Sequence, residues 1–208
     1  MSHSLGVRQA QKQKTRQAFL DAALGLLAEQ SLSSLGLREV TRAVGVAPTA
    51  FYRHFHSTAD LGVALVEEAL GSLHPMISGT VATAGDSDER IDRAVALIAR
   101  HVRAYPAHIR FIARERNGGV QQVRSAIAEQ MDRFADEVRA ELAKQAESDG
   151  WSDDDLLMLA GLYVDQMLMT ASAFLEADPD DPAEEARVAR VARRRMRLIS
   201  IGRRNWLG

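Results

Sequence analysis

Residues 37–55 read LREVTRAVGVAPTAFYRHF, and this stretch decides the fold. Apolar residues recur at three- and four-residue steps in its first part, which predicts a short helix that ends at Gly45 as its C-terminal cap. Pro48 suits the first turn of a helix, so a second short helix is predicted over residues 47–55. Two helices joined by a tight glycine turn are typical of a helix-turn-helix.

The second predicted helix has two different faces. Phe51 and Phe55 share one face, while Thr49 and Arg53 lie about opposite them by the 3.6-residue period. We expect the aromatic face to anchor in a core and the polar face to point outward. Insertion of a helix into the major groove of DNA requires this arrangement.

Outside this stretch almost every periodic segment also has helical spacing, so the predicted fold class is all-α. The expected helices cover residues 14–30, 60–82 with a bend near Pro75, 88–104, 107–115, 121–147, 152–176 and 183–205. We expect two domains, a helix-turn-helix domain over residues 1–60 and a helical ligand-binding and dimerisation domain over residues 61–208.

Charge is distributed unevenly along the 208 residues. The formal net charge is only −2, but residues 1–60 hold seven Lys and Arg against four Asp and Glu, a net charge of +3. Residues 61–208 hold nineteen against twenty-four, a net charge of −5. The basic first domain is therefore the candidate nucleic-acid surface.

The sequence also favours a cytoplasmic location. There is no cysteine, which fits a reducing compartment, and the polar N-terminus lacks the apolar stretch of a secretory signal. The longest apolar segment, residues 156–175, carries Asp165 and Gln166 at its centre, where a bilayer makes polar groups costly. We expect a buried helix there and no membrane partner.

The stretch quoted above resembles the TetR family of regulators, whose signature is a helix, a Gly-Val turn and then Phe/Leu-Tyr-x-His-Phe. LGVALV at 61–66, ARERNG at 113–118 and RLISIGRRNW at 197–206 resemble the FabR and DesT branch, which represses unsaturated fatty acid synthesis. The resemblance implies a repressor that binds double-stranded DNA. It also implies a C-terminal domain that forms a homodimer and holds an acyl-CoA.

The resemblance assigns DNA contacts to the helix-turn-helix residues. Thr49 and Ala50 correspond to base-edge and thymine-methyl contacts, and Tyr52 and His54 to phosphate contacts. Arg53 suits either role, because its planar fork matches both guanine and phosphate.

Three further DNA contacts are expected outside the second helix. Arg38 opens the first helix of the motif. Many members of the family carry a phosphate-binding lysine at the start of the fourth helix, but this chain has Ser57, Thr58, Ala59 and Asp60 there. We expect Thr58 and the helix N-terminus to replace it. Lys14 belongs to a basic arm that reaches phosphates or a minor groove, or is simply solvated.

Candidate ligand residues lie in the second domain. The apolar and polar candidates for a ligand tunnel are Phe111, Phe134, Leu162, Tyr163, Gln166, Met167 and Phe174. Ordinary core or dimer packing explains these positions as well. Arg114 and Arg116 are candidates for the phosphates of coenzyme A, with solvated helical arginines as the alternative.

The last helix is rich in arginine and carries an apolar stripe, which favours a dimer interface with a solvated rim over a membrane or anion surface. The histidines lack carboxylates at metal-ligand spacing, and no nucleophile elbow, phosphate loop or dinucleotide fingerprint is present in the sequence. We therefore expect no metal, no cofactor and no enzymatic activity.

The resulting hypothesis is a dimeric repressor that binds an inverted-repeat operator under acyl-CoA control. Three alternatives remain open. The effector is a different hydrophobic molecule, the protein is an acyl-CoA enzyme or carrier with an incidental helix-turn-helix, or it binds DNA without sequence preference.

Overall fold

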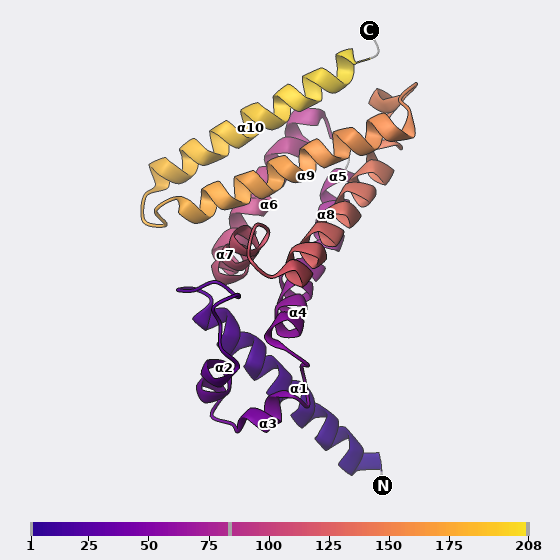
Figure 1. The fold of residues 1–208 in the computed structure, drawn as a ribbon. Coiled ribbons are helices and arrows are strands. Elements are labelled where there is room, and N and C mark those ends of the chain that lie inside the picture. The colour runs from indigo at the N-terminus through magenta and orange to yellow at the C-terminus, as the bar shows by residue number, and fades with distance from the viewer. Residues whose placement is uncertain (1, 83–84, 207–208) are drawn as a thin grey trace. The chain divides into compact units, whose positions relative to one another are not determined.

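The computed structural model describes residues 2–82 and 85–206, and within these ranges every regular element is helical. The α-helices are α1 (Ser2–Leu26), α2 (Leu37–Val44), α3 (Pro48–Phe51), α4 (Thr58–Gly71), α5 (His74–Ala82), α6 (Ser87–Ala104), α7 (Pro106–Glu115), α8 (Gln121–Leu142), α9 (Asp153–Glu176) and α10 (Pro182–Asn205). A 3-10 helix, η1, covers Ala146–Ser148 (Figure 1). The prediction of an all-α fold is confirmed.

The chain divides into two compact units. Unit 1 contains residues 1–69 and 110–127, and unit 2 contains residues 70–109 and 128–208. The unit boundaries fall inside α4, α7 and α8, so the compact unit that holds α1 to α3 also takes in a second segment of the chain. The domain boundary after residue 60 stays a prediction.

The core of unit 1 is built around aromatic rings from α1, from α3 and from the segment after α3. Phe19 and Phe51 are both fully buried, and their rings meet edge to face with centroids 5.4 Å apart. Phe55 is 2% exposed and packs against both rings at 6.2 and 5.5 Å. The two contacts of Phe19, with Phe51 and with Phe55, are edge to face, and such contacts stabilise a pair by about 0.5–1.5 kcal/mol beyond burial.

The turn between α2 and α3 has the geometry that the sequence predicts. Gly45 lies in the left-handed region at φ +75°, where an L side chain is strained, and its amide donates to the carbonyls at the end of α2. At the other end of α2, the Glu39 carboxylate accepts from the amide of the N-cap residue Gly36 at 3.1 Å, which is the acidic half of a capping box.

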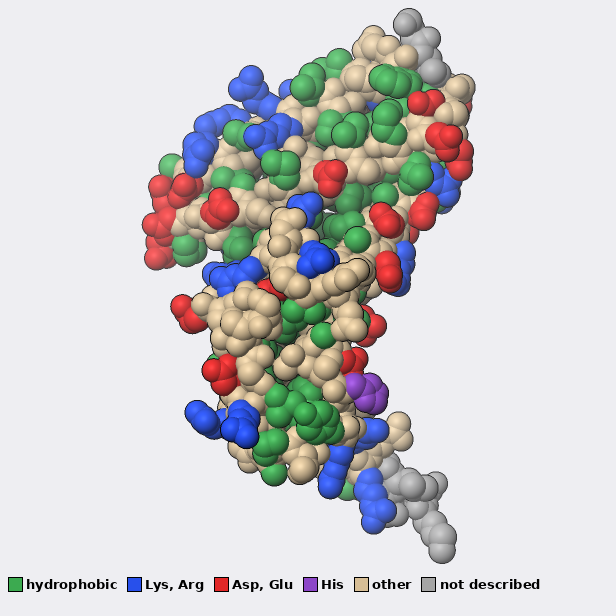
Figure 2. Space-filling model, in the orientation of Figure 1, with side chains coloured by type: hydrophobic (Ala, Val, Ile, Leu, Met, Phe, Trp, Pro, Cys, Tyr) green, Lys and Arg blue, Asp and Glu red, His purple; other side chains and the backbone are tan. Residues whose placement is uncertain are grey.

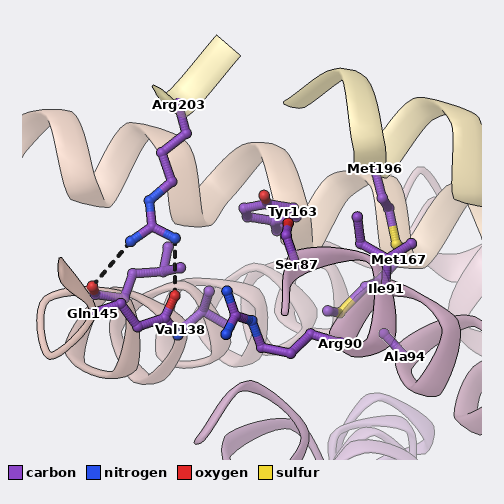
Figure 3. Close-up of a pocket in the computed structure, with 11 residues that line it drawn as sticks. Ser87, Arg90, Ile91, Ala94, Val138, Gln145, Tyr163, Met167, Met196 and Arg203 are labelled. Carbon is purple, nitrogen blue, oxygen red and sulfur yellow. Dashed lines mark hydrogen bonds between the residues drawn. The ribbon is translucent and has the colours of Figure 1, made fainter. Parts of the chain in front are cut away.

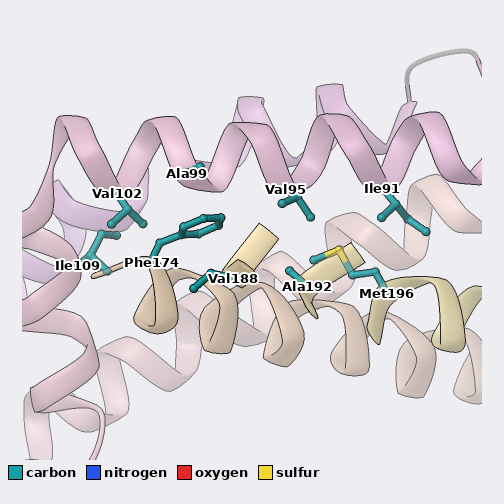
Figure 4. Close-up of a cluster of buried hydrophobic side chains, with 9 residues drawn as sticks. All are labelled: Ile91, Val95, Ala99, Val102, Ile109, Phe174, Val188, Ala192 and Met196. Atoms are coloured by element: carbon teal, nitrogen blue, oxygen red, sulfur yellow. The ribbon is translucent and has the colours of Figure 1, made fainter. Parts of the chain in front are cut away.

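Unit 2 has its own core between α6, α9 and α10. Figure 4 shows the α6 side chains facing side chains of α9 and α10. The buried cluster consists of Ile91, Val95, Ala99, Val102, Ile109, Phe174, Val188, Ala192 and Met196. In α10 the buried residues recur at three- and four-residue steps, which places one helix face in this core. Most of its arginines lie outside that face, but Arg203 is buried.

Several helix bounds differ from those expected. The first helix begins at Ser2 rather than residue 14, because its Gln-, Lys- and Arg-rich start favours helix without a packed face. The helix expected over residues 60–82 is interrupted after Gly71, whose carbonyl loses its helical partner because Pro75 has no N–H. The helix expected over residues 121–147 ends at Leu142. Beyond it, the Ser148 hydroxyl donates a hydrogen bond to the Leu142 carbonyl at 2.7 Å.

Helix α9 corresponds to the apolar segment of the sequence. Among residues 2–82 and 85–206 it is the one helix whose length and apolar composition would suffice to cross a membrane, with a mean hydropathy of 1.3. One face of α9 packs against α6 and α10 in the core of unit 2. A core helix of a helical bundle has these properties as well.

Candidate nucleic-acid interface

The second helix of the helix-turn-helix is shorter than predicted. We expected a helix over residues 47–55, but α3 spans Pro48–Phe51 only. The chain continues in tighter turns. The main-chain amide of Arg53 donates to the Ala50 carbonyl at 3.3 Å, and that of His54 donates to the Phe51 carbonyl at 2.8 Å. The rotation about the helix axis continues, so the two predicted faces are kept.

Burial separates these faces clearly. Phe51 and Phe55 are buried, as expected for the anchoring face. Tyr52 is 60% exposed, and Thr49 and Arg53 are exposed beside it. Figure 2 shows Lys and Arg side chains around the end of unit 1 that holds α2 and α3. The outer face therefore offers a hydroxyl, a phenol and a guanidinium to a ligand.

His54 lies at the edge of the aromatic core. Its ring is 5.7 Å from Phe19, and its Nδ1 is buried without a hydrogen-bond partner among the described residues. Burial, followed by the positive charges of Lys12, Arg16 and Arg53, lowers the pKa of His54. The imidazole is therefore held neutral at neutral pH, so a phosphate contact by His54 would use a neutral N–H.

The start of α4 carries a local hydrogen-bond pair. The Asp60 carboxylate accepts from the amide of His56 at 2.8 Å, and the Ser57 hydroxyl accepts from the amide of Asp60 at 3.1 Å. The Ser57 bond is that of an N-cap, while the Asp60 side chain reaches back one residue beyond the cap. Thr58, the predicted phosphate contact, is the first residue of α4 and is half-buried.

The remaining predicted DNA residues also belong to unit 1. Arg38 is exposed in the first turn of α2, Lys14 is exposed on α1, and Ala50 is half-buried on α3. Arg16, on the same helix as Lys14, places its guanidinium 5.1 Å from the centre of the Phe55 ring. The basic arm is thus a regular helix tied to the aromatic core at that position.

The predicted ligand residues are divided between the two units. Phe111, Arg114 and Arg116 lie in unit 1, and Phe111 is 1% exposed. The Arg114 guanidinium donates to the carbonyls of Leu27 and Gln30 at 2.8 and 2.7 Å. The Arg114 guanidinium is thus already hydrogen bonded to the main chain. Arg116, the other predicted phosphate contact, is exposed.

In unit 2 only two of the predicted ligand residues share a cavity. Tyr163 and Met167 line a cavity of about 60 Å³ between α6, α8, α9 and α10 (Figure 3). Four others lie elsewhere: Phe134 stacks on the ring of His74, Gln166 donates to Thr170, Phe174 belongs to the core and Leu162 is 48% exposed.

Sequence reasoning missed the polar residues of this cavity. Arg90 and Arg203 both line it, together with Gln145 and Ser87. A signal for Arg203 was present, because residue 203 continues the buried register of α10 through Met196 and Ser200. An arginine in a buried register needs internal partners, whereas the arginine-rich composition of α10 suggests a solvated face.

In the described part of the chain no three His, Cys, Asp or Glu side chains gather as a metal site would need.

Residues 37–55 thus form a helix-turn-helix with an exposed polar face. Residues 19–65 match the family described as "Bacterial regulatory proteins, tetR family". An uncharacterized HTH-type transcriptional regulator of Haemophilus influenzae is 39% identical over 141 residues, which are 64% of this chain and 65% of that protein. The chain therefore matches about two thirds of the length of this relative, and the matches support a TetR-family transcriptional regulator.

Solved structures share the fold. A TetR-family regulator from Syntrophomonas wolfei superposes with a TM-score of 0.72 at 13% identity, covering 91% of this chain and 96% of that one. The regulator FadR from Bacillus subtilis, solved with stearoyl-CoA, has a TM-score of 0.68 at 13% identity and covers 88% and 96%. At these identities the likeness concerns the fold alone.

Proposed function

We propose that this protein is a cytoplasmic transcriptional repressor, not an enzyme, that binds an inverted-repeat operator through the outer face of α2 and α3. The observation that carries the proposal is the pairing of a fully buried Phe51 with exposed Thr49, Tyr52 and Arg53 on consecutive turns. The buried ring fixes the helix, and the polar side chains lie free for base edges and phosphates.

The proposed roles follow from side-chain chemistry. Thr49 and Ala50 contact base edges and thymine methyl groups, while Tyr52, His54 and Thr58 contact phosphates. Arg53 donates to guanine or phosphate, and Arg38 and Lys14 add charge from α2 and α1. The net charge of +3 on residues 1–60 supports an anionic partner for this surface.

A homodimer is the second part of the proposal. Large apolar side chains are exposed along α9 and α10, and Figure 2 shows them on the surface over both helices. They are Leu157, Met158, Leu162, Met169, Val191, Leu198 and Ile201. Contiguous exposed apolar patches mark interaction sites. A second copy packed here would present two recognition helices to one palindrome.

We further propose that a long-chain acyl-CoA controls DNA binding. Support comes from the fold shared with FadR of Bacillus subtilis, which was solved with stearoyl-CoA. A fatty acid degradation regulator from Bacillus halodurans also has a TM-score of 0.68, at 16% identity. An effector of this kind acts only through different affinities for the DNA-competent and the DNA-incompetent state.

Fluorescence anisotropy tests the proposal. The purified protein is titrated onto the inverted repeat nearest its own gene, with a random duplex of equal length at the same salt concentration. We expect selective binding that Arg53→Ala and Tyr52→Ala abolish, while Arg133→Ala, an exposed arginine of unit 2, leaves it unchanged. Equal binding to both duplexes would contradict operator recognition and indicate that the protein binds DNA without sequence preference. Addition of stearoyl-CoA tests the effector separately.

A further inference from the structure

The cavity of unit 2 has a cationic end and an apolar end. Arg90 and Arg203 lie at one end, as Figure 3 shows, and Ile91, Met167 and Met196 at the other. Among the described residues that line the cavity none is acidic. Two guanidinium groups therefore face a small space without an anion on its wall.

Arg203 is the more deeply buried of the two, with 6% of its surface exposed. Its Nη atoms donate to the Gln145 side chain at 2.9 Å, to the Leu142 carbonyl at 3.3 Å and to the Ser148 hydroxyl. All three acceptors are neutral. Its Nε is buried and has no hydrogen-bond partner in the part of the chain that the structure describes.

This arrangement leaves a buried cation only partly compensated. Burial lowers the pKa of Arg203, and the Glu147 carboxylate, which lies outside the cavity lining, acts in the opposite direction. Arg90 donates to the Gly85 carbonyl at 2.6 Å and to Glu147 at 3.4 Å, so one carboxylate serves two guanidinium groups. A buried charge without a full set of partners is costly.

Hydroxyl groups complete the polar end. The Tyr163 hydroxyl is hydrogen bonded to Ser200, whose hydroxyl oxygen lies 2.5 Å from that of Ser87. Burial raises the pKa of Tyr163, so its proton is retained at neutral pH. The cavity wall therefore adds the hydroxyl groups of Tyr163 and Ser87 to the two guanidinium groups.

We propose that this cavity binds a short aliphatic monocarboxylate, with its carboxylate at Arg203 and Arg90 and its chain along Met167 and Met196. A carboxylate matches the guanidinium fork and satisfies the free Nε of Arg203. The cavity of about 60 Å³ is well below the roughly 150 Å³ that hold benzene, which limits the enclosed chain to a few carbons. The acyl end of an acyl-CoA offers no carboxylate here, because its carbonyl is a neutral thioester.

The site goes beyond the proposed function and does not depend on it, because a protein that binds no operator can still bind a carboxylate. Direct binding is therefore measured on the full chain without DNA. Protein labelled with ¹³C at the methionine methyl groups is titrated with sodium butanoate, and 1-butanol serves as the neutral counterpart. Stearoyl-CoA is titrated in parallel as the ligand of the proposed function.

Met167 and Met196 line the cavity, whereas Met158 and Met169 are exposed on α9 and provide internal controls. Butanoate is expected to shift the first two methyl resonances saturably, with an affinity about tenfold or more above that of 1-butanol. Arg203→Gln and Arg90→Gln are each expected to remove this preference. Arg194→Gln, an exposed arginine of the same helix outside this cavity, is expected to retain it.

Equal shifts with butanol, or shifts spread over all methionines, would overturn the proposal. Octanoate binding more than about tenfold tighter than butanoate would overturn the size limit. If Arg203→Gln fails to fold, the wild-type comparison of butanoate with butanol and the Arg90→Gln variant decide, because Arg90 has no role in the core cluster.

Discussion

The Glu115 carboxylate accepts a hydrogen bond from the main-chain amide of Leu32, with 2.9 Å between Oε1 and N across 83 residues of sequence. Glu115 is 1% exposed, and its neighbour Arg114 donates to the carbonyls of Leu27, Ala28 and Gln30. Those carbonyls belong to the turns that directly follow the end of α1 at Leu26. The end of α7 therefore holds the chain between α1 and α2 within unit 1.

Removal of the Glu115 acceptor is expected to destabilise the protein. Glu115→Ala leaves the buried Leu32 amide unpaired, which costs about 1–3 kcal/mol in the free energy of unfolding. Glu115→Gln keeps a carbonyl oxygen and is expected to lose less. Urea unfolding followed by circular dichroism measures both, with the exposed Glu129→Ala as control. Equal losses for Gln and Ala would show that Glu115 contributes something other than the acceptor.

Two glycines of unit 1 should respond to alanine with opposite signs. A Cβ at Gly62 would lie 2.4 Å from Leu32 Cδ2 and 2.7 Å from Val123 Cγ2, both from buried residues. Overpacking of this kind typically costs about 1–3 kcal/mol. A Cβ at Gly25 meets nothing within 4 Å, so Gly25→Ala is expected to stabilise by about 0.5–1 kcal/mol through helix propensity. Melting curves that moved in the same direction would contradict this packing.

Local signals in the sequence were enough for the fold class and for the turn of the helix-turn-helix. Gly45 and Pro48 act through their own backbone chemistry, and the Phe51 and Phe55 face follows from helical period alone. Such effects need no knowledge of distant residues. The end of α3 at Phe51 was missed, because a change from helix to turn depends on hydrogen bonds that periodicity does not report.

Side-chain contacts between residues far apart in the sequence could not be predicted from such local signals. The sequence predicts Arg114 and Arg116 as candidates for coenzyme A phosphates, yet Arg114 and its neighbour Glu115 bond to main-chain atoms more than 80 residues away. Arg203 looked like one more surface arginine of a basic helix, and its burial depends on α8 and η1. Composition describes what a side chain offers, but only the fold decides which partner meets it.

Stability should fall on mild acidification, and His54 should contribute to the fall. Burial and neighbouring cations lower its pKa in the folded protein below the ordinary value of 6.5. As the pH falls, the unfolded chain therefore takes up the proton before the folded protein does. The contribution of His54 to the free energy of unfolding is fully present above pH 6.5 and is lost as pH falls through the folded pKa. The slope of unfolding free energy between pH 7.5 and 5.5 should be smaller in His54→Gln than in wild type.

His101 is also buried, with a pKa lowered by burial and by His108, so a residual slope is expected in that variant. The exposed His56→Gln serves as the matched control. A slope unchanged by His54→Gln but reduced by His56→Gln would contradict the assignment.

The apolar face of α9 and α10 predicts where a single charge separates the proposed dimer. Leu198 is 70% exposed on α10, and in a two-fold dimer each substitution acts twice. Loss of two buried leucines costs about 3–6 kcal/mol, or at least about a hundredfold in dimer dissociation constant, before any repulsion between aspartates. Light scattering on a sizing column should therefore show Leu198→Asp as a monomer.

Val7→Asp is the matched control, because Val7 is 63% exposed but lies on α1, in unit 1. It is expected to leave the mass unchanged. Operator binding should weaken with Leu198→Asp although none of the proposed DNA-contacting residues changes, since a monomer holds only one half-site. A dimer that survives Leu198→Asp and dissociates with Val7→Asp would move the interface from α10 to α1.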